Sequence, residues 1–133
     1  MNEEHHELSH AGDNDAAATE KLIKINAWHA EQMKYLLDKL AMASEPDGGT
    51  LLDNSLVLWG NEIGVGNSHT YKDIPWLLAG GAGGKIRLGR FLQFKDQNHN
   101  NMLISLLHAM GFDDVTQFGY PELCTGPLPG LTA

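Results

Sequence analysis

The sequence predicts an α/β fold in which helices pack on a small mixed sheet. Three observations carry this prediction: a long segment with helical periodicity, two short apolar runs typical of buried strands, and a second helical segment near the C-terminus. The chain has 133 residues, 42% of them hydrophobic, which is enough for one domain with a core. Two fully buried strands need more covering elements than this chain holds, so we expect a single domain that is a fragment of a larger one.

The first half of the chain is expected to hold a polar arm and a long helix. Residues 1–16 lack apolar periodicity and carry acidic residues without Lys or Arg, so they form the arm. An amphipathic helix is expected over 17–43, with Asp13 or Asp15 as its N-cap and a stop at Pro46. Its apolar residues recur at helical spacing: Leu22, Ile25, Met33, Leu36 and Leu40.

Residues 50–112 are expected to form the sheet and the C-terminal helix. Buried strands are predicted at 56–59 and 74–79, where short runs are fully apolar. A short hairpin or irregular pair is predicted over 85–94, with Gly89 in its turn.

The C-terminal helix is expected from about 100 to 110. Gly111 follows its last apolar residue and is expected to end it as a left-handed cap. Residues 113–133 are rich in Pro and Gly and are expected to be an irregular tail.

Composition excludes several functional classes. A formal net charge of −8 argues against nucleic-acid binding, which needs clustered Lys and Arg. No apolar run approaches the roughly 18 residues of a membrane span, and the acidic N-terminus does not resemble a signal peptide. The single Cys124 excludes an internal disulfide and a multi-cysteine zinc site, so a metal would need His, Asp, Glu or Asn ligands.

The stretch HHELSH, residues 5–10, places His6 and His10 four positions apart. On a helical turn this spacing directs both imidazoles to one side, as two ligands of one metal require. The alternatives are a polar tail or an expression tag, although a tag would be a run of one residue type. Ser9 lies between the two histidines and is expected to hydrogen-bond a neighbouring ligand.

A second polar cluster follows the first predicted strand. Asn61 and Glu62 come directly after it, and His69 follows across a loop that holds Gly64 and Gly66. Ligands in α/β proteins bind where loops converge at the carboxyl ends of strands. An acid and an imidazole there can bind a divalent cation, whereas the alternative is a surface loop with ordinary polar residues.

Other candidate motifs have structural interpretations. AGGAGGKIR lacks the Ser or Thr and the first glycine of a phosphate loop, so these glycines are expected to form turns. His29 falls on the apolar face of the long helix and is expected to be a hydrogen-bonded core residue. Ser9 has no nucleophile-elbow context, which argues against a Ser–His–acid triad.

Four segments, taken in chain order, resemble the C-terminal part of a bacterial family of unknown function named for its HxxSH motif. They are HELSH, KINAWHAEQMKYLLDKL, TLLDNSLVLWGNEIGVGNSH and DIPWLLAGGAGG. The resemblance extends from about His5 to Phe112. It implies a relationship to the alkaline-phosphatase and sulfatase-like superfamily, and therefore part of a three-layer α/β/α sandwich with metal ligands at the edge of its sheet.

The resemblance also implies a ligand set. His6 and His10 would stand for an acid and a histidine that precede a helix. Asn61 and Glu62 would stand for an Asp-His pair at the end of a strand, and His69 for a later histidine. Because Asn-Glu replaces Asp-His, zinc, calcium, magnesium and manganese all remain open.

The function that follows is a metal-binding C-terminal segment of a phosphate- or sulfate-ester hydrolase. The superfamily's nucleophile lies in an N-terminal half, and Met1 precedes the HxxSH motif almost directly. We therefore expect a truncated, split or complexed chain that is inactive alone, with the missing half or a second copy as partner. The resemblance implies a periplasmic or secreted full-length protein.

Two alternatives remain. One is a non-catalytic binding or oligomeric assembly module on the same fold, which would use open sheet faces as an interface. The other is an unrelated small α/β domain with surface histidines.

Overall fold

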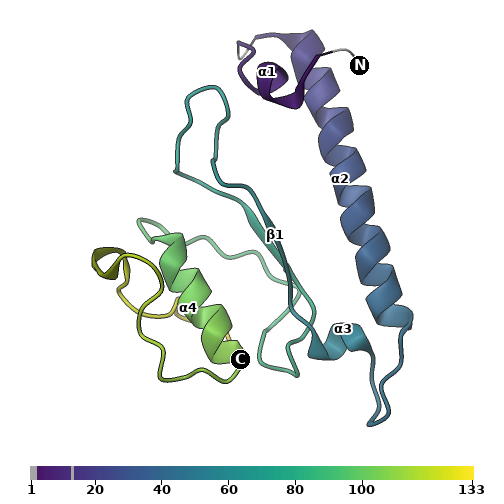
Figure 1. Ribbon diagram of the computed structural model, residues 1–133, viewed down its shortest axis with the longest axis vertical. Helices are drawn as coiled ribbons and strands as arrows, with labels where there is room; N and C mark the ends of the chain where they lie inside the picture. Colours follow the sequence, from purple (N-terminus) through teal and green to yellow (C-terminus); the bar gives the residue numbers. More distant parts are fainter. Residues whose placement is uncertain (1–2, 13) are drawn as a thin grey trace. The chain divides into compact units, whose positions relative to one another are not determined.

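The computed structural model describes residues 3–12 and 14–133, and Figure 1 shows a mixed α/β chain. Within this range there are four α-helices, one short 3-10 helix and one two-stranded antiparallel sheet. The coarse α/β prediction is confirmed, while the sheet is antiparallel where a mixed one was expected. The chain divides into an N-terminal unit, Met1–Leu40 with Leu58–Leu78, and a C-terminal unit, Ala41–Val57 with Ala79–Ala133.

The long helix α2 covers Ala16–Met42, close to the predicted 17–43. Asp15 caps it, because its carboxylate accepts a hydrogen bond from the Ala18 N–H at 2.9 Å. Asp13, the other predicted cap, lies outside the described residues. The expectation that His29 is a core residue is wrong: it is exposed and meets the Trp28 ring edge-on. Among the described helices, none has the length and apolar character of a membrane span.

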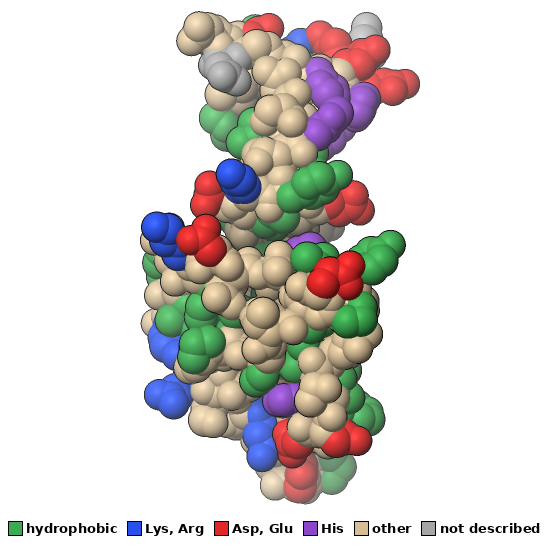
Figure 2. Space-filling view, turned by 90° about the vertical axis from the view of Figure 1, so that its left-hand side faces the viewer, with side chains coloured by type: hydrophobic (Ala, Val, Ile, Leu, Met, Phe, Trp, Pro, Cys, Tyr) green, Lys and Arg blue, Asp and Glu red, His purple; other side chains and the backbone are tan. Residues whose placement is uncertain are grey.

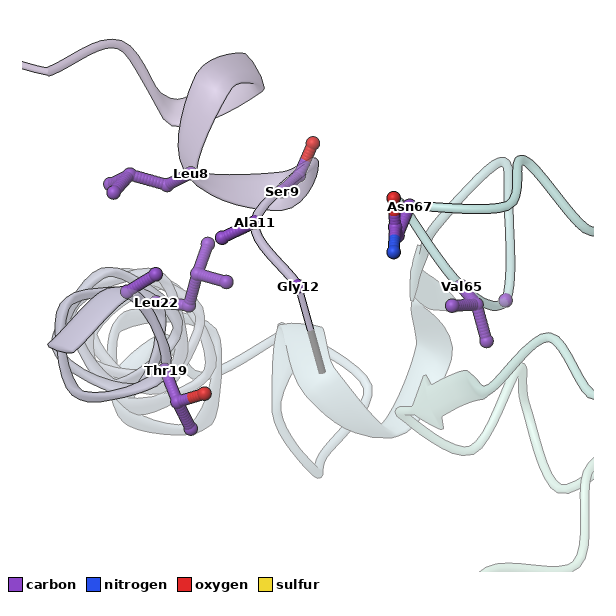
Figure 3. A pocket seen from close by; sticks show the side chains of 11 residues that line it. Leu8, Ser9, Ala11, Gly12, Thr19, Leu22, Val65 and Asn67 are labelled. Atoms are coloured by element: carbon purple, nitrogen blue, oxygen red, sulfur yellow. The ribbon is translucent and has the colours of Figure 1, made fainter. Parts of the chain in front are cut away.

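A short helix, α1, covers His5–Ser9 within the segment expected to be a polar arm. Its anchor is Leu8, which is 6% exposed. In Figure 3 the Leu8 side chain lies beside the first turns of α2. An ion pair between Lys21 and Glu3 also joins this segment to α2. Five residues with one apolar anchor show no periodicity, which is why the sequence pattern missed the helix.

Strands β1, Val57–Gly60, and β2, Trp76–Ala79, form the sheet. The prediction of buried strands is wrong, because most of their side chains are exposed. The exposed fractions are 37% for Leu58 and Trp59, 36% for Trp76 and 43% for Leu77. An apolar run reports how hydrophobic a strand is, but burial depends on what covers the sheet.

Helix α3, Leu51–Asn54, begins with a capping box. Thr50 Oγ1 accepts a hydrogen bond from the Asp53 N–H at 3.3 Å, and Asp53 Oδ2 accepts one from the Thr50 N–H at 2.7 Å. These two contacts satisfy donors that a helix start leaves free.

The glycine-rich segment 80–84 packs on the other end of α3. Three of its backbone N–H groups, in Gly81, Ala82 and Gly83, donate to the carbonyls of Leu52, Ser55 and Asp53 at 3.2, 3.0 and 2.9 Å. Donors used in this way are not free to cradle a phosphate. The expectation that these glycines form turns agrees with this arrangement.

Helix α4, His99–Ala109, is the centre of the C-terminal unit. It ends as predicted at Gly111, whose φ is 90°. Gly111 N–H donates to His108 O at 2.9 Å and Phe112 N–H donates to Leu107 O at 3.0 Å, the bonds of a Schellman motif. The buried apolar side chains of this unit come from α4 and two segments around it: Ile86, Met102, Ile104, Leu106, Ala109, Leu128 and Leu131.

The C-terminal tail is irregular apart from a 3-10 turn at Pro121–Leu123, yet it completes this core. Two polar side chains of α4 hold its backbone. Asn101 Oδ1 accepts from the Thr125 N–H at 2.9 Å, and Ser105 Oγ accepts from the Leu128 N–H at 2.7 Å. The tail is therefore part of the fold, which its Pro- and Gly-rich sequence did not indicate.

Of the two alternatives predicted for 85–94, a short hairpin or an irregular pair, the hairpin is wrong. Ile86 forms an antiparallel bridge with Thr132 of the tail instead. Arg90 donates to the carbonyls of Gly130 and Leu131 at 2.7 and 3.0 Å. Gly89 does occupy a turn, with φ of 71°. The segment thus pairs with a distant part of the chain, which a local pattern cannot show.

Candidate metal centre

Two histidines that are 59 positions apart meet within the N-terminal unit. The Nε2 atoms of His10 and His69 lie 3.2 Å apart, and the two rings are nearly perpendicular at 85°. His10 follows α1 and His69 belongs to the loop between β1 and β2. The HxxSH motif and one residue of the second polar cluster, His69, therefore come together at this point.

Helix α1 places His6 beside His10. The His6 and His10 ring centroids are 4.7 Å apart and their planes meet at 71°. This agrees with the expectation that the i, i+4 spacing directs both rings to one side. Ser9 Oγ donates to the His6 carbonyl at 2.7 Å, so it stabilises the backbone turn that carries both rings rather than an imidazole nitrogen.

The loop between the strands presents His69 at its tip. The tip is closed by an antiparallel bridge between Val65 and Thr70 and by a hydrogen bond from the His69 N–H to Gly66 O at 3.3 Å. His69 has a φ of 50°, in the left-handed region that non-glycine residues rarely adopt. The loop thus holds an imidazole at a position whose backbone conformation favours glycine.

Gly66 lets the loop approach α1 closely. A Cβ at this position would lie 3.0 Å from both Cβ and O of Ser9. Such contacts are tight, so a larger residue would push the loop tip away from the motif. Gly66 was read from the sequence only as a loop glycine, and its adjacency to Ser9 was missed because the two are far apart along the chain.

The three imidazoles are accessible from solvent. His6 and His69 are exposed and His10 is half-buried. Figure 2 shows histidine side chains gathered on the surface near acidic ones. The surroundings therefore suit a cation from solution rather than a buried structural ion.

Asn61 and Glu62 follow β1 and are exposed. Asn61 Oδ1 accepts a hydrogen bond from the Glu62 N–H at 2.9 Å, so the amide oxygen serves the local turn. Over residues 3–12 and 14–133, no three His, Cys, Asp or Glu side chains are grouped as a metal site requires. Neither Glu62 nor His6 therefore completes a three-ligand group with the His10–His69 pair in this arrangement, and the role of each as a ligand stays a prediction.

An open hollow of about 370 Å³ lies next to the motif. Figure 3 shows Leu8 and Leu22 on one side of it and Val65 and Asn67 on the other. Ser9 contributes to its wall, so the hollow adjoins the residue that precedes His10. Leu8, Leu22 and Val65 make part of the wall apolar, so the hollow can accommodate a non-polar group of a ligand next to the histidines.

The chemistry of the pair has two forms. One imidazole N–H can donate a hydrogen bond to the other ring's nitrogen, with the tautomers set accordingly, or both nitrogens can bind one cation. Comparison of the chain with family models, curated proteins and solved structures finds no match. The resemblance to the HxxSH-motif family accordingly remains an expectation based on the motifs.

Proposed function

We propose that this chain is a metal-binding segment whose centre is formed by His10 and His69, with His6 beside them. The observation that carries the proposal is the 3.2 Å separation of the two Nε2 atoms. Two neutral imidazole nitrogens gain one hydrogen bond at that distance, whereas a cation between them satisfies both lone pairs. The left-handed backbone of His69 adds support, because backbone strain often accompanies a functional constraint.

The metal would serve ester hydrolysis if the resemblance holds. In that case one or two divalent ions would polarise a phosphate or sulfate ester. The resemblance assigns Asn61 and Glu62 as further ligands, and the loop that carries them would need to turn toward the histidines. It assigns the nucleophile to no residue of this chain, so metal binding is the part of the reaction that this chain would supply.

The test is the metal content of the full chain, prepared without a tag and dialysed against a mixture of zinc, manganese, magnesium and calcium. We expect a bound divalent ion in the unaltered chain and loss of that ion in a His10→Asn, His69→Asn double variant. His29→Asn, which removes an exposed histidine from α2, is the matched control and should keep the metal. Equal metal in the double variant and the control would contradict the proposal.

A second candidate function is favoured by the exposed sheet. A two-stranded sheet is marginal alone, and its strands show four large apolar side chains to solvent: Leu58, Trp59, Trp76 and Leu77. On this basis the chain would be a non-catalytic assembly module that pairs with another polypeptide or a second copy. A stable oligomer by light scattering, unchanged by chelator and by the double histidine variant, would favour assembly over metal binding.

A further inference from the structure

We infer that the site selects a borderline transition metal of the zinc type over calcium and magnesium, with His6 as the third protein ligand. This inference rests on the proposed function, since it requires that the histidines bind a metal. It goes further by naming the class of ion and by excluding Glu62 from the ligands that hold it.

The donor atoms are the first argument. The atoms that face each other are imidazole nitrogens, Nε2 of His10 and Nε2 of His69. Calcium and magnesium prefer carboxylate, carbonyl and water oxygens, whereas imidazole suits zinc, copper, nickel and iron. Among the described residues no carboxylate and no third imidazole completes a group of three with the pair as the side chains stand. The donor set therefore lacks the oxygens that a hard cation needs.

The distance is the second argument. Zinc–nitrogen bonds of about 2.0 to 2.1 Å at a tetrahedral angle place two ligand nitrogens about 3.3 Å apart. The observed separation of His10 Nε2 and His69 Nε2 is 3.2 Å. The separation of the two nitrogens thus matches that of two ligands on one such ion.

The proposed third ligand, His6, lies on the turn before His10 and has to rotate toward the ion, because it forms no group of three with His10 and His69 as the side chains stand. The His6 ring lies with its centroid 4.7 Å from that of His10, and the side chain is exposed. Rotation about the side-chain bonds of an exposed histidine is fast and costs little, so a nitrogen of His6 can turn toward the ion. Three histidines with one position left for water or substrate form a known arrangement of catalytic zinc.

The experiment measures affinity for Zn²⁺, Co²⁺, Ca²⁺ and Mg²⁺ by calorimetry on the full chain, first stripped with chelator. We expect Zn²⁺ to bind at least roughly 100-fold more tightly than Ca²⁺ or Mg²⁺. Co²⁺ should give the intense visible absorption of a four-coordinate site and be displaced by Zn²⁺. The spectrum reports the ligand field directly and requires no catalytic activity.

Four variants separate the ligands from the fold. His69→Asn and His6→Asn should each weaken Zn²⁺ binding by roughly tenfold or more. Glu62→Gln and His29→Asn should leave it unchanged. Because a variant can lose metal by unfolding, His69→Gly provides a second check: glycine suits the left-handed backbone, so this variant should keep its circular dichroism and still lose Zn²⁺.

The outcomes distinguish the two proposals. Binding of Ca²⁺ or Mg²⁺ as tightly as Zn²⁺, or a loss of Zn²⁺ affinity in Glu62→Gln equal to that in His69→Asn, would overturn this inference and leave metal binding in place. An octahedral Co²⁺ spectrum would overturn it too. Absence of binding by all four ions would remove the proposed function together with this inference.

Discussion

At the scale of single residues, His69 combines an unfavourable backbone with a side chain that meets another imidazole. Its φ of 50° costs a non-glycine residue about 1 kcal/mol. We therefore expect His69→Gly to raise the free energy of unfolding of the metal-free chain slightly while it lowers metal affinity. Urea denaturation with chelator measures the first effect and calorimetry the second. A variant that loses both stability and affinity would show that the His69 ring has a packing role instead.

Asp53 gives a second prediction at this scale. Hydrogen bonds from the Thr50 hydroxyl and then the Thr50 N–H hold the pKa of the Asp53 carboxyl below its usual 3.8. Because the folded pKa is lower than the unfolded one, the carboxylate's contribution to stability is present above pH 3.8 and is lost as pH falls through the folded pKa. Asp53→Asn should therefore be less stable than the unaltered chain near neutrality, and the difference should shrink in acid.

Denaturation of both proteins across this pH range measures the effect. Asp47→Asn, in the turn before α3, is the control because Asp47 is not the residue that closes the capping box. A difference that stays constant from neutral pH into acid would exclude the carboxylate as its source.

At the scale of elements, the contact between α3 and the glycine segment should be intolerant of side chains. A Cβ at Gly80 would lie 2.3 Å from Ser55 O, and the φ of Gly80 is 94°. Gly84 has a similar φ of 84° with nothing within 4 Å of the added atom. Gly84→Ala should cost about 1 kcal/mol from the backbone alone. Gly80→Ala should cost about 3 kcal/mol or more, because the clash adds to the backbone term.

The two variants share the sign of φ, so the difference between their free energies of unfolding isolates the steric contact. Chemical denaturation monitored by circular dichroism gives both values. Equal losses would mean that the segment shifts away from α3 at little cost.

The hydrogen bonds between Asn101 of α4 and Thr125 of the tail, here called the clamp, give a further prediction. Asn101 is 2% exposed, and its amide makes three hydrogen bonds, two with Thr125 and one with Gln97. Asn101→Ala leaves the Thr125 N–H without this partner and should cost about 2 to 3 kcal/mol. Asn98→Ala is the matched control, because the Asn98 side chain at the N-cap makes no capping hydrogen bond. Equal effects of the two changes would contradict a clamp.

Elements of different kinds were predictable to different degrees. Helices α2 and α4 could be predicted because their periodicity is local. The residues that bound them, such as Asp15 before α2 and Gly111 after α4, lie within a few residues of the periodic segment. The bridge of Ile86 with Thr132 depends on chain that is far away in sequence, so the expected hairpin was wrong. The spacing of His6 and His10 is local and predicted their adjacent rings. The sequence grouped His69 with His10 only through the family resemblance, because no local pattern links positions 59 residues apart. The exposure of the strand before His69 was not predicted.

At the scale of the whole molecule, burial is unequal between the two units. The N-terminal unit has two buried apolar residues, Leu8 and Ala18, among those described, while the C-terminal unit has seven on and around α4. A small core leaves the N-terminal unit to depend on other contacts for its stability. The His10–His69 contact joins α1 to the loop between the strands, so a bound metal would stabilise this unit and leave the other unaffected.

Hydrogen exchange of the full chain with and without Zn²⁺ measures this difference. At a free metal concentration of 100 times Kd, linkage gives about 2.7 kcal/mol, so amides that exchange by opening of the metal site should slow by roughly 100-fold. We expect that protection in 3–12 and 61–75, and none in α4 or the tail. The His10→Asn, His69→Asn double variant should show none anywhere. Equal protection of α4 would mean that the ion binds elsewhere or that the two units open together. Either result would contradict a metal site that stabilises the N-terminal unit alone.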